Sequence, residues 1–196
     1  ERRERQWASI VPVRFRDFRL STSPQKEIAA RLANSIAESS DDNNYAPDNY
    51  SWYLHGAWGV GKTGLAIGYL WAWLESNSDS AIYITVPDLL TRIKDTYRDN
   101  SDESESAVID RYAEVAMLIL DDIGAEHGNP KSGWLQDRLY QIINRRHADI
   151  RPTVFTSNLS LVEIQKTIGP RISWRIAEMC TPERIVHLQG RNLRAR

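Results

Sequence analysis

The chain has 196 residues, a length that predicts one domain or one domain with an appendage. Its 41% apolar and 26% charged residues are ordinary globular usage and exclude wholesale disorder. The formal net charge of -1 excludes a globally basic nucleic-acid-binding protein, but it is compatible with a local basic patch. One cysteine excludes a disulfide scaffold, and no apolar run approaches the roughly 18 residues of a membrane span.

From these features we expect a cytoplasmic protein without a membrane partner. Because the chain begins with Glu1 rather than with methionine, we also expect it to be part of a longer protein. Residues 1–23 are rich in arginine and aromatic side chains, and Pro12 interrupts their apolar alternation, so we predict an extended arm here. Residues 24–196 are predicted to form one folded domain, which opens with a helix over 24–37.

The rest of the chain alternates short apolar runs with segments of helical periodicity. Strands are predicted at 51–55, 81–86, 115–120, 153–158 and 184–189. Helices are predicted at 62–74, 87–98, 106–112, 134–147, 159–168 and 171–179. Five apolar strands that alternate with helices favour an α/β fold in which helices cover both faces of a parallel sheet.

A phosphate-binding loop is predicted between the first of these strands and the helix that follows it. The pattern G-x-x-x-x-G-K-[ST] is formed by Gly56, Ala57, Trp58, Gly59, Val60, Gly61, Lys62 and Thr63, and Gly64 continues it. Glycines let main-chain N–H groups approach phosphate oxygens, and the positive end of the next helix attracts the anion. We expect Lys62 to reach the β- and γ-phosphates and Thr63 to ligate Mg²⁺. A strand before the loop and a helix after it favour this prediction over a turn that binds nothing.

An acidic pair follows the apolar run at 117–120. Asp121 and Asp122 are expected at the carboxyl edge of the sheet, where open α/β folds bind their ligands. There, Asp121 would hold Mg²⁺ through water and Asp122 would act as the general base toward the attacking water. Glu126 is the alternative base, and a strand that ends in a solvated turn is the alternative to the whole site.

Asn158 closes the next predicted strand. A polar side chain at that position can bind the γ-phosphate or the attacking water. The alternative is a helix cap or an Asx-turn, which asparagine also favours.

These motifs carry a family resemblance. In chain order, the segments that carry it are GAWGVGKT, MLILDDIGAE, LYQIINRRH, TVFTSNLS, GPRISWRI and LQGRNLR. They resemble the DnaC/DnaI helicase loaders and, similarly, the IstB transposition ATPases, a sister group within the AAA+ ATPases. The resemblance implies a three-layer P-loop AAA+ core with a five-stranded parallel sheet. Because only RNLRAR follows the last strand segment, the C-terminal lid is expected to be minimal or absent.

The resemblance also implies roles for single residues. Lys62 and Thr63 match the Walker A residues, Asp121 and Asp122 match the Walker B pair, and Asn158 matches sensor 1.

Three arginines near the C-terminus acquire roles from the same resemblance. Arg171 and Arg175 lie in the segment that carries the arginine finger, which completes a neighbouring subunit's site, and Arg171 is favoured. Arg194 falls where the loaders place a sensor-2 arginine.

The resemblance places a path for single-stranded DNA along the helix at 87–98. Its candidate contacts are Arg92, Lys94 and Arg98, although a solvated helix face has the same composition. Tyr97 could add base stacking, but its position four residues after Ile93 indicates the core.

The function predicted from these features is that of an ATPase acting in DNA replication. It would bind ATP or ADP with Mg²⁺, hydrolyse ATP slowly, self-associate in an ATP-dependent way, and contact a replicative helicase through a preceding region. One alternative is an IstB-like transposition ATPase that binds duplex DNA. Another is a nucleotide-switched binding module with little hydrolysis, against which the acidic residue Asp122 argues.

Overall fold

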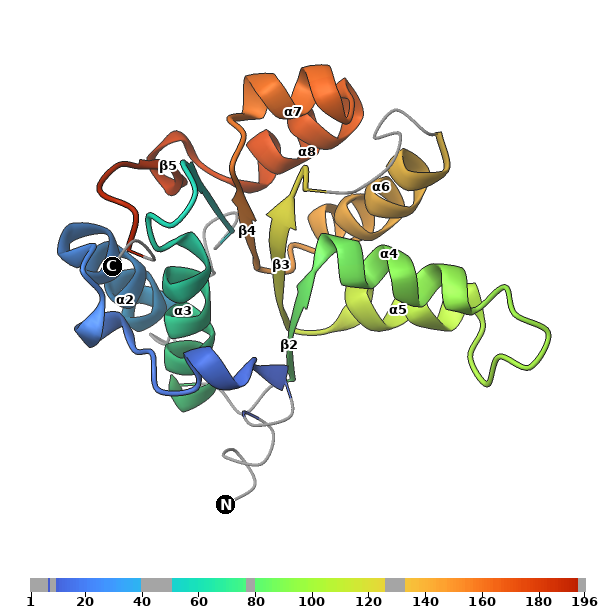
Figure 1. The fold of residues 1–196 in the computed structure, drawn as a ribbon, viewed down its shortest axis with the longest axis horizontal. Coiled ribbons are helices and arrows are strands. Elements are labelled where there is room, and N and C mark those ends of the chain that lie inside the picture. Colours follow the sequence, from blue (N-terminus) through green and yellow to red (C-terminus); the bar gives the residue numbers. More distant parts are fainter. Residues whose placement is uncertain (1–6, 8–9, 40–50, 77–79, 126–132, 194–196) are drawn as a thin grey trace.

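The computed structural model describes residues 7, 10–39, 51–76, 80–125 and 133–193. The described strands form one parallel sheet in the order β2-β3-β4-β1-β5 (Figure 1). The strands are β1 (Trp52–Gly56), β2 (Ala81–Thr85), β3 (Met117–Ile123), β4 (Thr153–Ser157) and β5 (Ile185–Leu188). The predicted parallel α/β sheet is confirmed.

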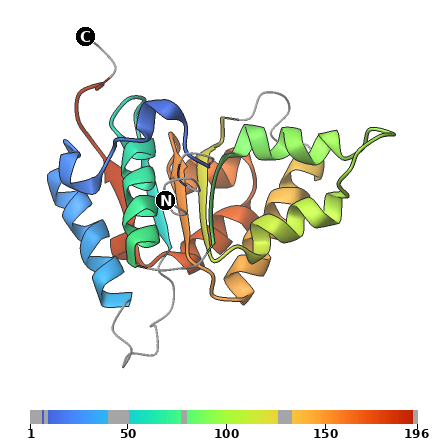
Figure 2. The same ribbon diagram turned by 90° about the horizontal axis from the view of Figure 1, so that it is seen from below.

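Helices cover both faces of this sheet, as Figures 1 and 2 show. The α-helices are α2 (Lys26–Ser39), α3 (Lys62–Ser76), α4 (Val86–Asp95), α5 (Glu105–Glu114), α6 (Gly133–Ala148), α7 (Leu161–Thr167) and α8 (Pro170–Met179). Helices α2 and α3 pack in one buried apolar cluster, and α4 to α8 pack in the other. The three-layer architecture expected from the resemblance is therefore present. No helix in the described part of the chain has the length and apolarity needed to cross a membrane.

Element boundaries differ from the predicted ones where side chains cap a helix or where the sheet bulges. Val86 begins α4 rather than ending β2, because the side chain of Thr85 accepts a hydrogen bond from the main-chain N–H of Asp88. Strand β3 continues through the acidic pair to Ile123, with an irregular register against β4 after Leu120.

Where the structure describes the first segment, at residues 7 and 10–23, the predicted extended conformation is wrong. Short 3-10 turns form at Val13–Phe15 and Leu20–Thr22, and Trp7 is buried. The indole of Trp7 packs edge-on against Trp71 of α3, with ring centroids 4.9 Å apart. Burial of a large aromatic side chain stabilises this folded course over an extended one. The division of the chain after residue 23 stays a prediction.

One arginine holds the strands and helices together from inside. Arg146 of α6 is fully buried, and its guanidinium donates to the hydroxyl of Thr153 and to five main-chain carbonyl oxygens. The shortest of these contacts reach Val115 and Pro152, both at 2.7 Å. The acceptors lie at the end of α5 and just before β3 and β4, where main-chain carbonyls lack partners within their own elements.

The C-terminal segment returns to the loop that follows β1. The main-chain N–H of Leu193 donates a 2.9 Å hydrogen bond to the carbonyl oxygen of Gly59. Within the described residues, β5 is the last helix or strand, and the minimal lid stays a prediction.

Candidate nucleotide-binding site

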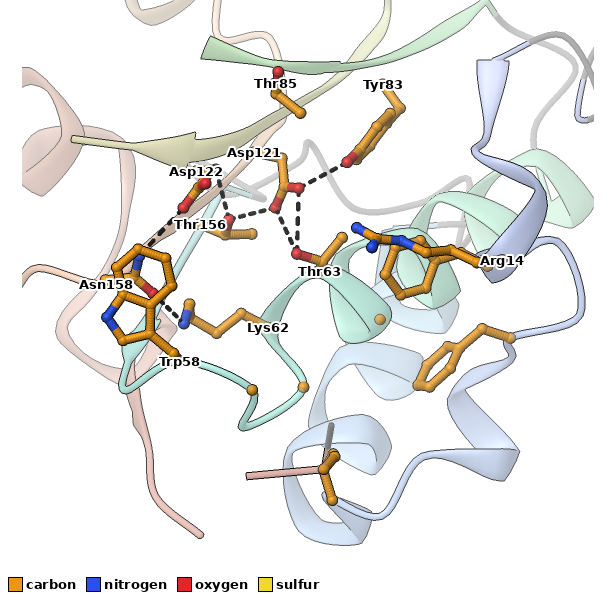
Figure 3. A pocket seen from close by; sticks show the side chains of 16 residues that line it. Arg14, Trp58, Lys62, Thr63, Tyr83, Thr85, Asp121, Asp122, Thr156 and Asn158 are labelled. Carbon is orange, nitrogen blue, oxygen red and sulfur yellow. Dashed lines mark hydrogen bonds between the residues drawn. The ribbon is translucent and has the colours of Figure 1, made fainter. Parts of the chain in front are cut away.

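A cavity of about 400 Å³ opens at the carboxyl edge of the sheet, beside the first turn of α3 (Figure 3). Its walls include most of the residues predicted for the nucleotide site, namely Trp58, Gly59, Gly61, Lys62, Thr63, Gly64, Asp121, Asp122 and Asn158. Of the other predicted loop residues, Gly56 and Ala57 supply carbonyl oxygens to Lys62, and Val60 is buried beneath the loop. The loop and the acidic pair, separate in sequence, thus share one cavity.

The course of the loop requires glycine at two positions. Gly59 has a φ of 79° and Gly61 a φ of 104°, a region that side chains with a Cβ rarely adopt. A Cβ on Gly59 would also lie 1.8 Å from the side-chain oxygen of Asn192. Trp58, between the glycines in sequence, exposes 68% of its surface beside the cavity.

The Lys62 side chain folds back along its own loop. Its ammonium donates hydrogen bonds of 2.8 Å to the carbonyl oxygens of Gly56 and Ala57, and another of 2.8 Å to the side-chain oxygen of Asn158. This arrangement holds a nearly buried cation beside the cavity, from which the flexible side chain can turn toward a phosphate group.

Asp121 is the centre of a cluster of hydroxyl groups. The Thr63 hydroxyl lies 3.1 and 3.2 Å from the two carboxylate oxygens of Asp121. The Thr156 hydroxyl donates to one carboxylate oxygen at 2.5 Å, and the Tyr83 phenol donates to the other at 2.7 Å. A hydroxyl and a carboxylate side by side are the hard oxygen donors that suit Mg²⁺, which takes its remaining ligands from water and phosphate. Thr63 and Asp121 therefore fit the predicted metal site.

Tyr83, in the middle of β2, was not among the residues predicted for the site. Burial and the negative charge of Asp121 raise the pKa of Tyr83, so the phenol keeps its proton and remains a donor to the carboxylate. The one available signal was a hydroxyl-bearing aromatic in a strand that otherwise consists mainly of apolar residues.

Asp122 has an unusual backbone conformation, with a φ of 64°. Aspartate tolerates this left-handed region better than most residues. The main-chain N–H of Asp122 donates a 2.9 Å bond to the Thr156 hydroxyl, which turns the chain at the bulge in β3. The amide nitrogen of Asn158 then lies 3.3 Å from a carboxylate oxygen of Asp122. Asn158 thus connects the acidic pair to Lys62.

The alternative prediction for Asn158, a helix cap, is not what the structure shows. Ser160 is the N-cap of α7, and it forms a reciprocal capping box with Glu163. The side chain of Asn158 is instead directed toward the cavity (Figure 3).

The two arginine-finger candidates lie on α8, and neither lines the cavity with Lys62. Arg175 is engaged within its own chain, because it donates to Asn144 at 2.9 Å and also bonds Glu178. Arg171 is more exposed, with 63% of its side chain accessible, and it rests 3.9 Å above the ring of Tyr140. Its exposure suits contact with another molecule better than that of Arg175. Arg194 and Glu126 lie outside the described residues.

The three cations predicted to contact DNA lie on or just after α4, and each has an intramolecular neighbour. Arg92 pairs with Glu103 at 3.3 Å and Arg98 with Asp95 at 3.0 Å, while the Lys94 ammonium lies 5.2 Å from the ring centroid of Trp134. These are exposed contacts of modest strength, so each cation can exchange its partner for a phosphate.

The core position indicated for Tyr97 is wrong, since 54% of the residue is exposed. Helix α4 ends at Asp95, so the spacing from Ile93 no longer places Tyr97 on the buried face. Its ring instead lies against Trp134, with centroids 6.3 Å apart.

Three features define a P-loop ATPase fold of the AAA+ class. They are the parallel sheet with this strand order, the phosphate-binding loop after β1 and the acidic pair at the end of β3. The family model of IstB-like ATP binding proteins matches residues 16–187, and the chain belongs to this family.

Within that class, the chain is similar in sequence and in structure to replicative helicase loaders. It is 29% identical over 162 residues to the replicative helicase loader DnaC of Escherichia coli (strain K12), covering 83% of this chain and 62% of that relative. Among solved structures, a crystal structure of DnaI superimposes with a TM-score of 0.73 at 23% identity, covering 97% of this chain and 100% of that one. A crystal structure of the DnaC helicase loader superimposes with a TM-score of 0.71 at 22% identity, covering 90% and 98% respectively. These structural likenesses show the fold.

Proposed function

We propose that the chain binds ATP or ADP with Mg²⁺ and hydrolyses ATP as the motor domain of a replicative helicase loader. The observation that carries this proposal is the meeting of Lys62, Thr63, Asp121, Asp122 and Asn158 around one cavity. A cation, a hydroxyl and carboxylate pair, and a polar amide are the groups that phosphoryl transfer to water needs.

The chain's own residues divide the work of hydrolysis. Lys62 would bind the terminal phosphates, while Thr63 and Asp121 would hold Mg²⁺, which supplies charge neutralisation at the phosphate oxygens when it is bound. The Asp122 carboxylate would accept a proton from the attacking water, and the Asn158 amide, 3.3 Å from that carboxylate, would fix its orientation. Arg171 of an adjacent subunit would stabilise the charge that develops on the γ-phosphoryl group, which makes turnover slow and dependent on assembly.

The loader assignment rests on the relatives. The curated relative from E. coli is named a replicative helicase loader, and the chain spans 62% of its length. Helicase contact is therefore assigned to a region outside the chain. Single-stranded DNA is assigned to the cations of α4, and self-association to the face that carries Arg171. A cytoplasmic location belongs to the same proposal.

A transposition ATPase is the second candidate, because the matching family model is that of IstB-like proteins. The two candidates differ in the nucleic acid that they bind, since the loader acts on single strands and the transposition ATPase on duplex DNA.

Calorimetry with a non-hydrolysable ATP analogue and Mg²⁺ tests the nucleotide site that both candidates share. We expect Lys62→Ala to abolish binding and to leave the circular dichroism spectrum unchanged, because the bonds described above join the ammonium to carbonyl oxygens of its own loop and to Asn158, at the cavity rather than in the apolar core. Lys26→Ala is the control, since Lys26 bonds the carbonyl oxygen of Ser21 away from the cavity. Unchanged affinity of Lys62→Ala would refute the nucleotide site.

A further inference from the structure

A basic residue from the N-terminal segment lines the same cavity. Arg14 lies in the 3-10 turn at Val13–Phe15, upstream of the predicted domain boundary, and it contributes to the cavity wall together with Lys62 and Thr63. Figure 3 shows its guanidinium directed toward Thr63 and Asp121. The sequence motifs assigned no role to this arginine.

Arg14 is exposed and forms no ion pair within the described part of the chain. Its guanidinium carbon lies 4.6 Å from the ring centroid of the adjacent Phe15. The cation therefore faces the cavity beside the groups of the predicted metal site.

The segment that carries Arg14 is anchored by other residues. Trp7, Val11 and Leu20 are buried in the cluster shared with α2 and α3. The ring of Phe18 packs so closely on Gly64 that a Cβ there would lie 2.9 Å from it. Arg14 is thus held at the start of α3 by a packed scaffold, and its own side chain does not maintain that scaffold.

The position of Arg14 relative to Asn158 indicates which part of a nucleotide it would meet. Figure 3 shows Arg14 and Asn158 on opposite sides of Lys62 and Thr63. If the γ-phosphate lies against Lys62, Asp122 and Asn158, then Arg14 faces the part of the phosphate chain nearest the nucleoside. A guanidinium is well suited to that ligand, because its planar donors can bind two phosphate oxygens at once.

We propose that Arg14 is a nucleotide-binding residue, which contacts the phosphate chain at its nucleoside end and so makes the N-terminal segment part of the ATP site. The inference deepens the proposed function and rests on it. Because the contact is made to a phosphate that ATP and ADP share, it contributes to the affinity of both.

Calorimetry on the full chain with Mg²⁺ tests this placement, using ADP and a non-hydrolysable ATP analogue in parallel. Arg14→Ala should weaken both affinities about tenfold and by equal factors, as expected for loss of one charged hydrogen-bonding group. Arg14→Lys should fall between, since it keeps the charge but loses the planar fork. Lys26→Ala removes one positive charge from the same part of the chain and should bind both nucleotides as the parent does.

The possible results separate this inference from the function on which it rests. Unchanged affinities in Arg14→Ala, or an equal loss in Lys26→Ala, would overturn a direct contact. A loss confined to the ATP analogue would overturn the placement at the nucleoside end. Nucleotide binding that survives Lys62→Ala would instead refute the ATP site itself. Urea unfolding of Arg14→Ala should match the parent, and a large drop in its midpoint would show that the residue acts through the fold.

Discussion

The phenol of Tyr83 donates a 2.7 Å hydrogen bond to a carboxylate oxygen of Asp121, and this bond joins β2 to the predicted metal ligand on β3. The carboxylate is nearly buried, so its orientation depends on the hydroxyl groups around it. Thr156 holds the other oxygen, and the Thr63 hydroxyl lies within hydrogen-bonding distance of both. Tyr83 would therefore act on a bound Mg²⁺ through Asp121.

Tyr83→Phe should lower the free energy of unfolding by about 1.5 kcal/mol, because a charged hydrogen bond to a nearly buried group is lost. It should also raise the Mg²⁺ concentration that gives half-maximal binding of an ATP analogue. Urea unfolding and a Mg²⁺ titration followed by calorimetry measure the two effects. Tyr140→Phe, on the separate face beside Arg171, is the control for the titration. An unchanged Mg²⁺ requirement in Tyr83→Phe would contradict the positioning role.

Asp122→Asn should retain nucleotide binding and lower ATP turnover by about 10²-fold or more, the usual contribution of a general base. Asparagine is the appropriate substitution because it also tolerates the φ of 64° at this position. Phosphate release at saturating ATP measures turnover. If Asp122→Asn is nearly silent and Glu126→Gln is inactive, the base is Glu126.

The sequence allowed the phosphate-binding loop and the acidic pair to be predicted because each is a local pattern. The glycines of the loop, Lys62 and Thr63 lie next to one another in the sequence, and an apolar run directly precedes Asp121. The role of Tyr83 could not be predicted in the same way, because it depends on the register that aligns Tyr83 with Ile119 and Thr85 with Asp121 across two strands.

Burial explains the other gaps between sequence and structure. The arginines of the predicted arm suggest a solvated segment. Trp7 in the same segment nevertheless packs against Trp71, which lies 64 positions further along the chain. That tertiary contact is what brings Arg14 to the cavity wall. Arg146, adjacent to the half-buried Arg145 in sequence, is fully buried because main-chain carbonyls from the end of α5 and from the residues before β3 and β4 converge on it.

Arg146→Met should destabilise the domain by about 3 kcal/mol or more, because it leaves buried carbonyl oxygens without donors. Arg146→Lys should be intermediate, since an ammonium has three donors for the acceptors around it. Arg145→Met is the matched control; it removes only exposed ion pairs with Asp110 and Glu114 and should cost about 1 kcal/mol or less. Urea unfolding followed by circular dichroism ranks the three variants by their free energies of unfolding. Equal effects of Arg146→Met and Arg145→Met would contradict the role assigned to the buried guanidinium.

The last prediction concerns the cations on and just after α4. Binding to single strands should be weak, dependent on the ATP analogue and nearly independent of base sequence, because phosphate neutralisation carries no sequence information. For each phosphate contact, the logarithm of affinity should fall by about 0.7 per unit of log salt concentration. Contacts from Arg92, Lys94 and Arg98 would therefore give a slope of about -2 for log affinity against log salt concentration. Fluorescence anisotropy of a labelled oligonucleotide at two salt concentrations measures this slope.

Two variants should change this binding in opposite directions. Reversing Arg92 and Lys94 to Glu should abolish it without changing affinity for the ATP analogue. Glu103→Gln should strengthen it, because Glu103 holds Arg92 in an ion pair that DNA must displace. Undiminished binding by the reversed variant would show that α4 is only a solvated face. A consistent preference for duplex DNA, with both variants responding as stated, would favour the transposition ATPase over the helicase loader.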